Sequence, residues 1–396
     1  MLDSILFKNS GRQDQIIDIG ALAEGLIFYG RVRILGDAGV VQYLVKKIPP
    51  LILVELIESG RIEFHYAHET LGVRTKQSYL GEIHDLVKFT LSGVSYEDKA
   101  IQVFRQATSS SQARLAGYKF GRIIKKFEHD SFGQESVIQA LAASSSTESA
   151  VATIIRKLAP EYQQPQDLRF KINLQRSTTF TVETNIDFEK ANCSHASSPP
   201  SSHPVLTSAY IVSLLQGAYT SVFYGATFNS EVSVGTLEAA LGLHALEGVL
   251  SRSATGEKNI GEFVELTLDN TYAIREAVNT GRVTFFEVLS LLDAADKFRH
   301  WVAGVPDDKD LKRAYYQEVV KDSKLERLPL KTSRWACFTA AGLSIDLLGA
   351  GGLGTAAGVA LGAADTFLVD KWVAGWKPNH FIEGDFKKLF ADKHLP

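Results

Sequence analysis

The spacing of apolar residues in the N-terminal third of the chain switches between the period of a helix and that of a strand. Apolar side chains recur at helical spacing over residues 16–28. A short strand is predicted over residues 31–35 and a second over residues 61–66, where apolar and polar positions alternate strictly. Two helical stretches separated by Pro49-Pro50 lie between the strands. A strand, a helical crossover and a second strand predict a small N-terminal α/β unit.

The middle of the chain holds a run of helices followed by its clearest strand pattern. Residues 97–159 read as successive helices interrupted by serine clusters, and the sequence PEYQQP over residues 160–165 predicts a boundary. Beyond it, apolar and polar residues alternate over residues 168–174 and again over residues 180–188, which predicts a β-hairpin that covers one face of a core. A flexible Ser/Pro-rich loop is predicted over residues 194–204.

Residues 205–229 contain no charged side chain. The stretch includes several Ser, Thr and Gln residues, so a pair of buried helices fits it better than a membrane span. We expect the pair to be broken near Gly217 or Gly225, because glycine weakens a helix interior.

The last third of the chain is predicted to be helical. Thr284 and Glu287 have the spacing of a capping box at the start of an amphipathic helix over residues 285–302. The expected fold is therefore α+β and mainly helical, with a small N-terminal α/β unit, a central β-hairpin with helices, and a C-terminal helical region ending in a Gly/Ala-rich hairpin. The expected regions are 1–160 (α/β and helical), 165–260 (central α+β, containing the Ser/Pro loop) and 261–396 (helical).

Composition narrows the class of protein but does not name a reaction. The chain has 396 residues and a formal net charge of -3, so it has no global attraction for nucleic acid or for acidic lipids. Two cysteines, Cys193 and Cys337, cannot supply a disulfide framework. The N-terminus shows no basic region followed by an apolar run, so a cytoplasmic protein is expected.

A glycine pattern near the C-terminus matches the phosphate loop of dinucleotide-binding domains. Gly349, Gly351 and Gly354 fit G-x-G-x-x-G, and Asp370 follows. That loop functions between a buried strand and a helix, with further strands after it. Residues 335–348 have the pattern of a helix instead, and the sequence after Asp370 is rich in turns. We therefore expect no nucleotide and no other cofactor.

Small residues also recur at every fourth position of this segment, and this pattern has a better physical explanation. The positions are Ala350, Gly354, Gly358 and Gly362. On a helix they form one bare stripe, which lets a second backbone approach closely. Each glycine costs about 1 kcal/mol relative to alanine in a helix, so a compensating contact is required. The sequence predicts a helical hairpin over residues 335–376 whose stripe makes that contact.

The predicted hairpin has some features of a membrane segment. Residues 347–364 carry no charge and would span about 27 Å as a helix. Trp372, Trp376 and Lys377 then resemble interfacial anchors. Asp346 opposes insertion, because an aspartate costs about 2.5–3.5 kcal/mol at the centre of a bilayer. We expect a hairpin that is soluble or associates with a membrane surface. Insertion of the hairpin into the bilayer is the alternative.

Two groups of residues in the N-terminal region have side chains suited to catalysis. His65, His68 and Glu69 supply imidazole and carboxylate ligands of the kind that bind zinc or iron. Asp37, Glu69 and Asp85 could hold a divalent metal in a hydrolase or nuclease. Neither spacing matches an established metal motif, and polar positions on half-exposed strands explain both groups.

A basic segment over residues 112–127 could also contact phosphates. Its cations are Arg114, Lys119, Arg122, Lys125 and Lys126. Its aromatic residues, Tyr118, Phe120 and Phe127, are expected on the core face of one continuous helix. The segment therefore predicts a solvated helix face, and a nucleic-acid partner is not expected.

The function expected from the sequence is non-catalytic. The chain is predicted to self-associate, or to dock on a protein partner or a membrane surface, through the glycine-rich hairpin over residues 335–376. A homo-oligomer or a protein partner is expected. The alternative is a metal-dependent hydrolase or nuclease whose acidic and histidine residues lie in the N-terminal region.

Overall fold

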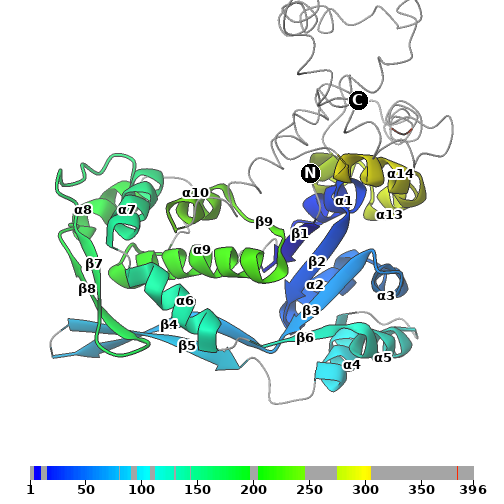
Figure 1. The fold of residues 1–396 in the computed structure, drawn as a ribbon, viewed down its shortest axis with the longest axis horizontal. Helices are drawn as coiled ribbons and strands as arrows, with labels where there is room; N and C mark the ends of the chain where they lie inside the picture. Colours follow the sequence, from blue (N-terminus) through cyan, green and yellow to red (C-terminus); the bar gives the residue numbers. More distant parts are fainter. Residues whose placement is uncertain are drawn as a thin grey trace, which may run out of the picture.

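The computed structural model describes residues 4–9, 16–79, 81–90, 96–107, 112–128, 131–142, 144–196, 204–245 and 274–304, together with Phe381. These residues form two β-sheets with helices packed on them (Figure 1). The α+β class predicted from the sequence is confirmed. The glycine-rich segment 335–376 lies outside the described residues.

The first sheet has five parallel strands in the order β6-β3-β2-β1-β9. Its strands are β1 (Ser4–Lys8), β2 (Arg31–Gly36), β3 (Ile62–Ala67), β6 (Lys125–Phe127) and β9 (Glu231–Ser233). The two strands predicted in the N-terminal region are confirmed as β2 and β3. The register places Arg33 of β2 opposite Leu6 of β1 and opposite Glu63 of β3. Because alternate residues of a strand point to opposite faces of a sheet, residues that lie opposite one another in this register share a face.

One face of this sheet is apolar and packs against five helices. The helices are α1 (Ile19–Phe28), α2 (Ala38–Lys47), α3 (Pro50–Glu58), α4 (Tyr96–Ala107) and α5 (Ala113–Ile123). The first three helices begin where the sequence favours it: Asp18 and Asp37 accept hydrogen bonds from the first turns of α1 and α2, and Pro50 opens α3. Phe7, Phe64 and Tyr66 are fully buried between the sheet and these helices.

Three further helices form a second layer over α1. They are α12 (Ile274–Asn279), α13 (Phe285–Leu289) and α14 (Leu292–Ala303). The capping box predicted for Thr284 and Glu287 is confirmed. The single helix predicted over residues 285–302 is wrong, because the chain turns at Ser290 and Leu291, whose amides bond to carbonyls only three residues back.

The second sheet is antiparallel, with strand order β4-β5-β8-β7. Its strands are β4 (Glu69–Ser78), β5 (Gly81–Thr90), β7 (Phe170–Leu174) and β8 (Thr179–Thr184). The hairpin predicted after residue 165 is confirmed as β7 and β8. His84 of β5 pairs with Phe180 of β8, so the sheet joins segments from both sides of the sequence PEYQQP.

Helices cover one face of the second sheet, and the longest of them also reaches the first sheet (Figure 1). These helices are α6 (Ser131–Ala142), α7 (Ser144–Leu158), α8 (Phe188–Ala196), α9 (Ser208–Phe228) and α10 (Thr236–Ala245). Leu215 of α9 belongs to the core of the second sheet, whereas Tyr224 packs with strand residues of the first. One helix therefore links the two sheets.

The uncharged stretch forms α9 as one uninterrupted helix of 21 residues. The break predicted near Gly217 or Gly225 is wrong, because packing of the helix against both sheets outweighs the weak helix propensity of glycine. The helix is capped by Asn229, which adopts a left-handed conformation with φ 43°. None of the helices in the described part of the chain has the combination of length and apolarity that a bilayer crossing requires.

Candidate functional site

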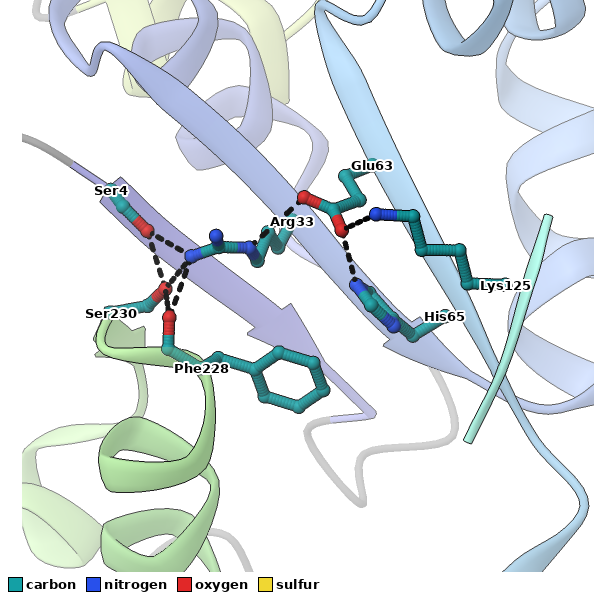
Figure 2. A network of polar contacts seen from close by, with 7 residues as sticks. All are labelled: Ser4, Arg33, Glu63, His65, Lys125, Phe228 and Ser230. Carbon is teal, nitrogen blue, oxygen red and sulfur yellow. Dashed lines mark hydrogen bonds and ion pairs between the residues drawn. The ribbon is translucent and has the colours of Figure 1, made fainter. Parts of the chain in front are cut away.

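A polar network lies on the face of the five-stranded sheet that turns away from α1–α5 (Figure 2). Period-2 alternation produces it: Phe64 of β3 points into the apolar core, while Glu63 and His65 point to the other face. The participating residues come from four strands and from the end of α9. They are Ser4, Arg33, Glu63, His65, Lys125, Phe228 and Ser230.

Arg33 is the centre of the network, and its side chain is only 11% exposed. Its Nη1 donates to the Oγ of Ser4 at 2.6 Å, to the Oγ of Ser230 at 2.6 Å and to the carbonyl of Phe228 at 2.7 Å. Its Nε donates to the Oε2 of Glu63 at 3.2 Å. The last carbonyls of a helix lack partners within the helix and carry partial negative charge. Arg33 therefore caps α9 and ties its end to the sheet.

Glu63 connects Arg33 to the far edge of the sheet. Its Oε1 accepts hydrogen bonds from the Nζ of Lys125 and from the Nε2 of His65, the latter at 3.0 Å. Burial disfavours the charged carboxylate, but the bond from Lys125, the positive charge that His65 carries at acid pH and the bond from Arg33 outweigh burial and lower the pKa of Glu63 to about 2. Glu63 is thus an ionised acceptor at neutral pH.

His65 contacts both Glu63 and the end of α9. Burial lowers the pKa of His65, although Glu63 favours the charged form. A neutral imidazole that bonds an ionised carboxylate through Nε2 must carry its proton on that nitrogen. The ring also meets the Phe228 ring edge to face, with centroids 4.6 Å apart. The last residue of α9 is therefore held by its carbonyl and by its side chain.

The chemistry of this network favours a structural role. A carboxylate that orients a neutral histidine also occurs beside catalytic nucleophiles. In the part of the chain that the structure describes, however, His65 forms no hydrogen bond to a hydroxyl or thiol, and both carboxylate oxygens of Glu63 are engaged. Lys125 is the most exposed member, at 61%. The network joins the sheet to α9, and we assign it no reaction.

The residues proposed as metal ligands take other partners. His65 bonds to Glu63, which belongs to the same strand. Glu69 begins β4 and lies 4.0 Å from the Nζ of Lys88. Among the described residues, no group of three His, Cys, Asp or Glu side chains is arranged to hold a metal ion, and His68 joins no such group.

The acidic residues proposed for a nuclease are distributed over both sheets. Asp37 follows β2 and accepts the amide of Val40 at 2.9 Å, which makes it the cap of α2. Asp85 lies on β5, where a hydrogen bond from Thr179 and an ion pair with Arg74 lower its pKa. The described contacts of these residues are structural, so they give the hydrolase or nuclease alternative no support.

The basic segment differs from its prediction in two ways. The helix α5 ends at Ile123, and residues Lys125–Phe127 form the edge strand β6 instead of continuing the helix. Tyr118 does not lie on the core face: its side chain is exposed, and the guanidinium of Arg122 lies 5.7 Å from its ring centre. Phe120, in contrast, is buried as expected.

The predicted contact and anchor residues of the hairpin lie outside the described residues. These are Ala350, Gly354, Gly358 and Gly362, followed by Trp372, Trp376 and Lys377. Phe381, the next described residue after them, is buried against Phe298 of α14 with ring centroids 5.1 Å apart.

Sequence reasoning missed Arg33 as the centre of the network. The available signal was a charged residue between apolar neighbours in the short strand RVRILG. Its partners Phe228 and Ser230 are nearly two hundred positions away, and no local pattern connects them. No protein-family model, no curated protein and no solved structure matches the chain. Function is therefore inferred from the chain's own contacts.

Proposed function

We propose that the chain is a non-catalytic interaction protein that self-associates, or docks on a protein partner or a membrane surface, through the hairpin predicted for residues 335–376. The stripe of Gly354, Gly358 and Gly362 is the contact surface in this proposal, because absent side chains allow close approach of two helices. Trp372 and Lys377 orient it at the partner or at the lipid headgroups.

The contact between Phe381 and Phe298 is the observation that carries the proposal. Phe381 lies beyond the predicted hairpin and is buried on α14, and α14 ends five residues after Phe298, about 7.5 Å along a helix. The two described residues that flank the segment 305–380, Gly304 and Phe381, therefore lie at the same helix. A hairpin brings its own two ends together, so these attachment points fit it better than an extended linker.

The shared attachment also constrains how the segment would meet a membrane. Gly304 and Phe381 belong to one folded body, which lies on one side of any bilayer. A segment that enters the bilayer between them has to return to the same side. Membrane docking by this chain would therefore use a re-entrant hairpin or a surface-bound one, with Trp372 and Trp376 at the headgroup level.

The test is Gly358→Leu in the full chain, with Gly358→Ala as the matched control. Leucine places a branched side chain on the stripe, whereas alanine keeps it small. If the wild type self-associates in sedimentation, we expect the leucine variant to be monomeric. If the wild type floats with vesicles of phosphatidylcholine and phosphatidylserine, we expect the leucine variant not to float. The alanine variant should retain whichever property the wild type shows.

A second variant separates a contact defect from misfolding. In it, residues 335–376 are replaced by a Gly/Ser linker while Phe381 is kept. We expect this protein to melt at the wild-type temperature but to behave as Gly358→Leu does in sedimentation and flotation. Wild-type sedimentation and wild-type flotation by both variants would refute the proposal.

A further inference from the structure

Two neighbouring helices on the outer layer of the first sheet present opposite charges to solvent. The helices α3 and α5 pack side by side (Figure 1). Lys119 of α5 forms an ion pair with Glu58 of α3. The exposed stripe of α3 is Leu51, Glu55 and Glu58, at the spacing of one helix face. The helix contains no basic residue. It therefore contributes an acidic stripe that begins with an apolar side chain.

The outward face of α5 is basic and partly apolar. Its exposed residues are Arg114, Leu115, Tyr118, Lys119 and Arg122, and the helix contains no acidic residue. Its inward face already packs on α4: a Cβ at Gly117 would lie 2.9 Å from the Cα of Ile101. The outward side chains are therefore not required by the core of their own protomer.

These outward side chains are only weakly engaged within one protomer. Lys119 and Glu58 are 3.8 Å apart and each about half exposed (45% and 44%), a pair of the kind that contributes little to stability. Leu115 is 55% exposed and Tyr118 is 52% exposed, so an apolar strip remains in solvent between the charges. Neighbouring exposed apolar groups surrounded by charge are typical of a contact surface.

We propose that this α3–α5 surface binds the same surface of a second copy of the chain about a two-fold axis. In such an interface each contact occurs twice with the roles exchanged. The acidic stripe of α3, Glu55 and Glu58, then faces the basic stripe of α5, Arg114 and Arg122, of the other copy. Leu51, Leu115 and Tyr118 form the apolar centre.

The charge distribution favours a second copy over a polyanion. Nucleic acid or an acidic membrane would be attracted to Arg114 and Arg122 but repelled by Glu55 and Glu58 on the adjacent helix. A second copy satisfies both stripes. The helices have 9 and 11 residues, so each is only about 14–17 Å long, which places the interface at the small end of specific contacts. The dimer is accordingly weak and sensitive to salt.

A charge exchange tests this pairing in the full chain. One variant carries Glu55→Lys and Glu58→Lys, and the other carries Arg114→Glu and Arg122→Glu. Each variant alone places like charges at both contacts, so its dimer dissociation constant should rise at least ten-fold in sedimentation equilibrium. An equimolar mixture restores opposite charges at both contacts and should form a heterodimer of near wild-type affinity.

The control reverses charge elsewhere on the surface. Arg169→Glu with Lys171→Glu changes the net charge as the α5 variant does, but lies on and beside β7, and should leave the dissociation constant unchanged. A wild-type chain that stays monomeric at 100 μM, variants that associate normally, or a mixture that fails to recover association would each overturn the proposal. Loss of binding to heparin or to phosphatidylserine vesicles without recovery on mixing would indicate a polyanion, and would also overturn it.

The same experiment is run in parallel on chains that carry Gly358→Leu. Association through the predicted hairpin is lost in that background, whereas association through the α3–α5 surface is kept. The two self-association surfaces are therefore tested independently, because a failure of one leaves the result for the other readable.

Discussion

Arg33 donates a hydrogen bond of 2.7 Å to the carbonyl of Phe228, although the two residues are 195 positions apart in the chain. The same solution occurs at the end of α1, where Arg299 of α14 donates to the carbonyl of Leu26. In both places a guanidinium from a distant segment satisfies a helix C-terminus. Long-range capping of this kind couples the integrity of a helix end to correct tertiary assembly.

Replacing Arg33 should destabilise the fold. Arg33→Met keeps much of the apolar stem but leaves the Phe228 carbonyl and the carboxylate of Glu63 without this donor, so we expect a loss of about 2–4 kcal/mol in the free energy of unfolding. Arg33→Lys should lose less, because it keeps the charge but not the fork of donors. Urea titration followed by circular dichroism measures both. Equal stability of Arg33→Met and the wild type would contradict the assigned role.

Glu63 should make stability depend on pH in the acid range. Its pKa is about 2 in the folded chain and near 4.5 in its ordinary state, so the folded chain binds fewer protons. Its contribution is fully present above about pH 4.5 and is lost as the pH falls toward 2. Glu63→Gln should flatten the dependence of stability on pH within that window. Glu183→Gln, at an exposed position, should leave it unchanged. Thermal melts at half-unit pH steps measure the slopes.

His84 should make stability depend on pH near neutrality. It is buried on β5, and its ring stacks on Phe180. Its Nδ1 shares a hydrogen bond with the Thr75 hydroxyl, whereas its Nε2 has no hydrogen-bond partner among the described residues. Burial lowers its pKa below 6.5, against the attraction of Glu82, so stability is complete above pH 6.5 and falls as the pH drops through the lowered pKa.

The variant His84→Gln removes the titrating group from this position. It should be less stable than the wild type at pH 7.5, because the stacking on Phe180 is lost. Its melting temperature should nevertheless fall less than that of the wild type between pH 7.5 and pH 5.5. His65 also has a lowered pKa, so the double variant with His65→Gln should depend on pH still less. An unchanged pH slope in both variants would show that these imidazoles do not control acid sensitivity.

Two helical glycines should respond in opposite directions to alanine. A Cβ at Gly20 of α1 would lie 2.1 Å from the carbonyl oxygen of Arg275, so Gly20→Ala has to push α12 away and should cost about 1–3 kcal/mol. A Cβ at Gly217 of α9 would meet nothing within 4 Å, so Gly217→Ala should gain about 1 kcal/mol from helix propensity. Chemical denaturation measures both, and each variant is the control for the other.

Patterns with a clear period predicted the elements that have two unlike faces. The strand β3 was predicted because Phe64 packs in a core while Glu63 and His65 face the polar network. The strands β7 and β8 were predicted for the same reason. The strand β1 was missed because its sequence SILFK is short and buried along most of its length, so it shows no clear alternation.

Features that depend on distant segments were beyond local patterns. The edge strand β6 continues the basic run of α5 in sequence, and only its pairing with β3 makes it a strand. The two residues between β4 and β5, Tyr79 and Leu80, lack the Asn-Gly or Asp-Gly signal of a tight hairpin. The exposure of Tyr118 likewise depends on which side of α5 the helix α4 covers.

The pairing of β1 with β9 has a consequence for synthesis of the chain. Ser4 and Ser230, which meet beside Arg33, are separated by 226 positions. At about 5–20 residues per second, a ribosome needs roughly 11–45 seconds to make that interval. During this time the backbone of the first strand lacks its second neighbour, and Arg33 lacks the helix end it caps. The nascent protein therefore presents an unfinished sheet edge until β9 has been synthesised.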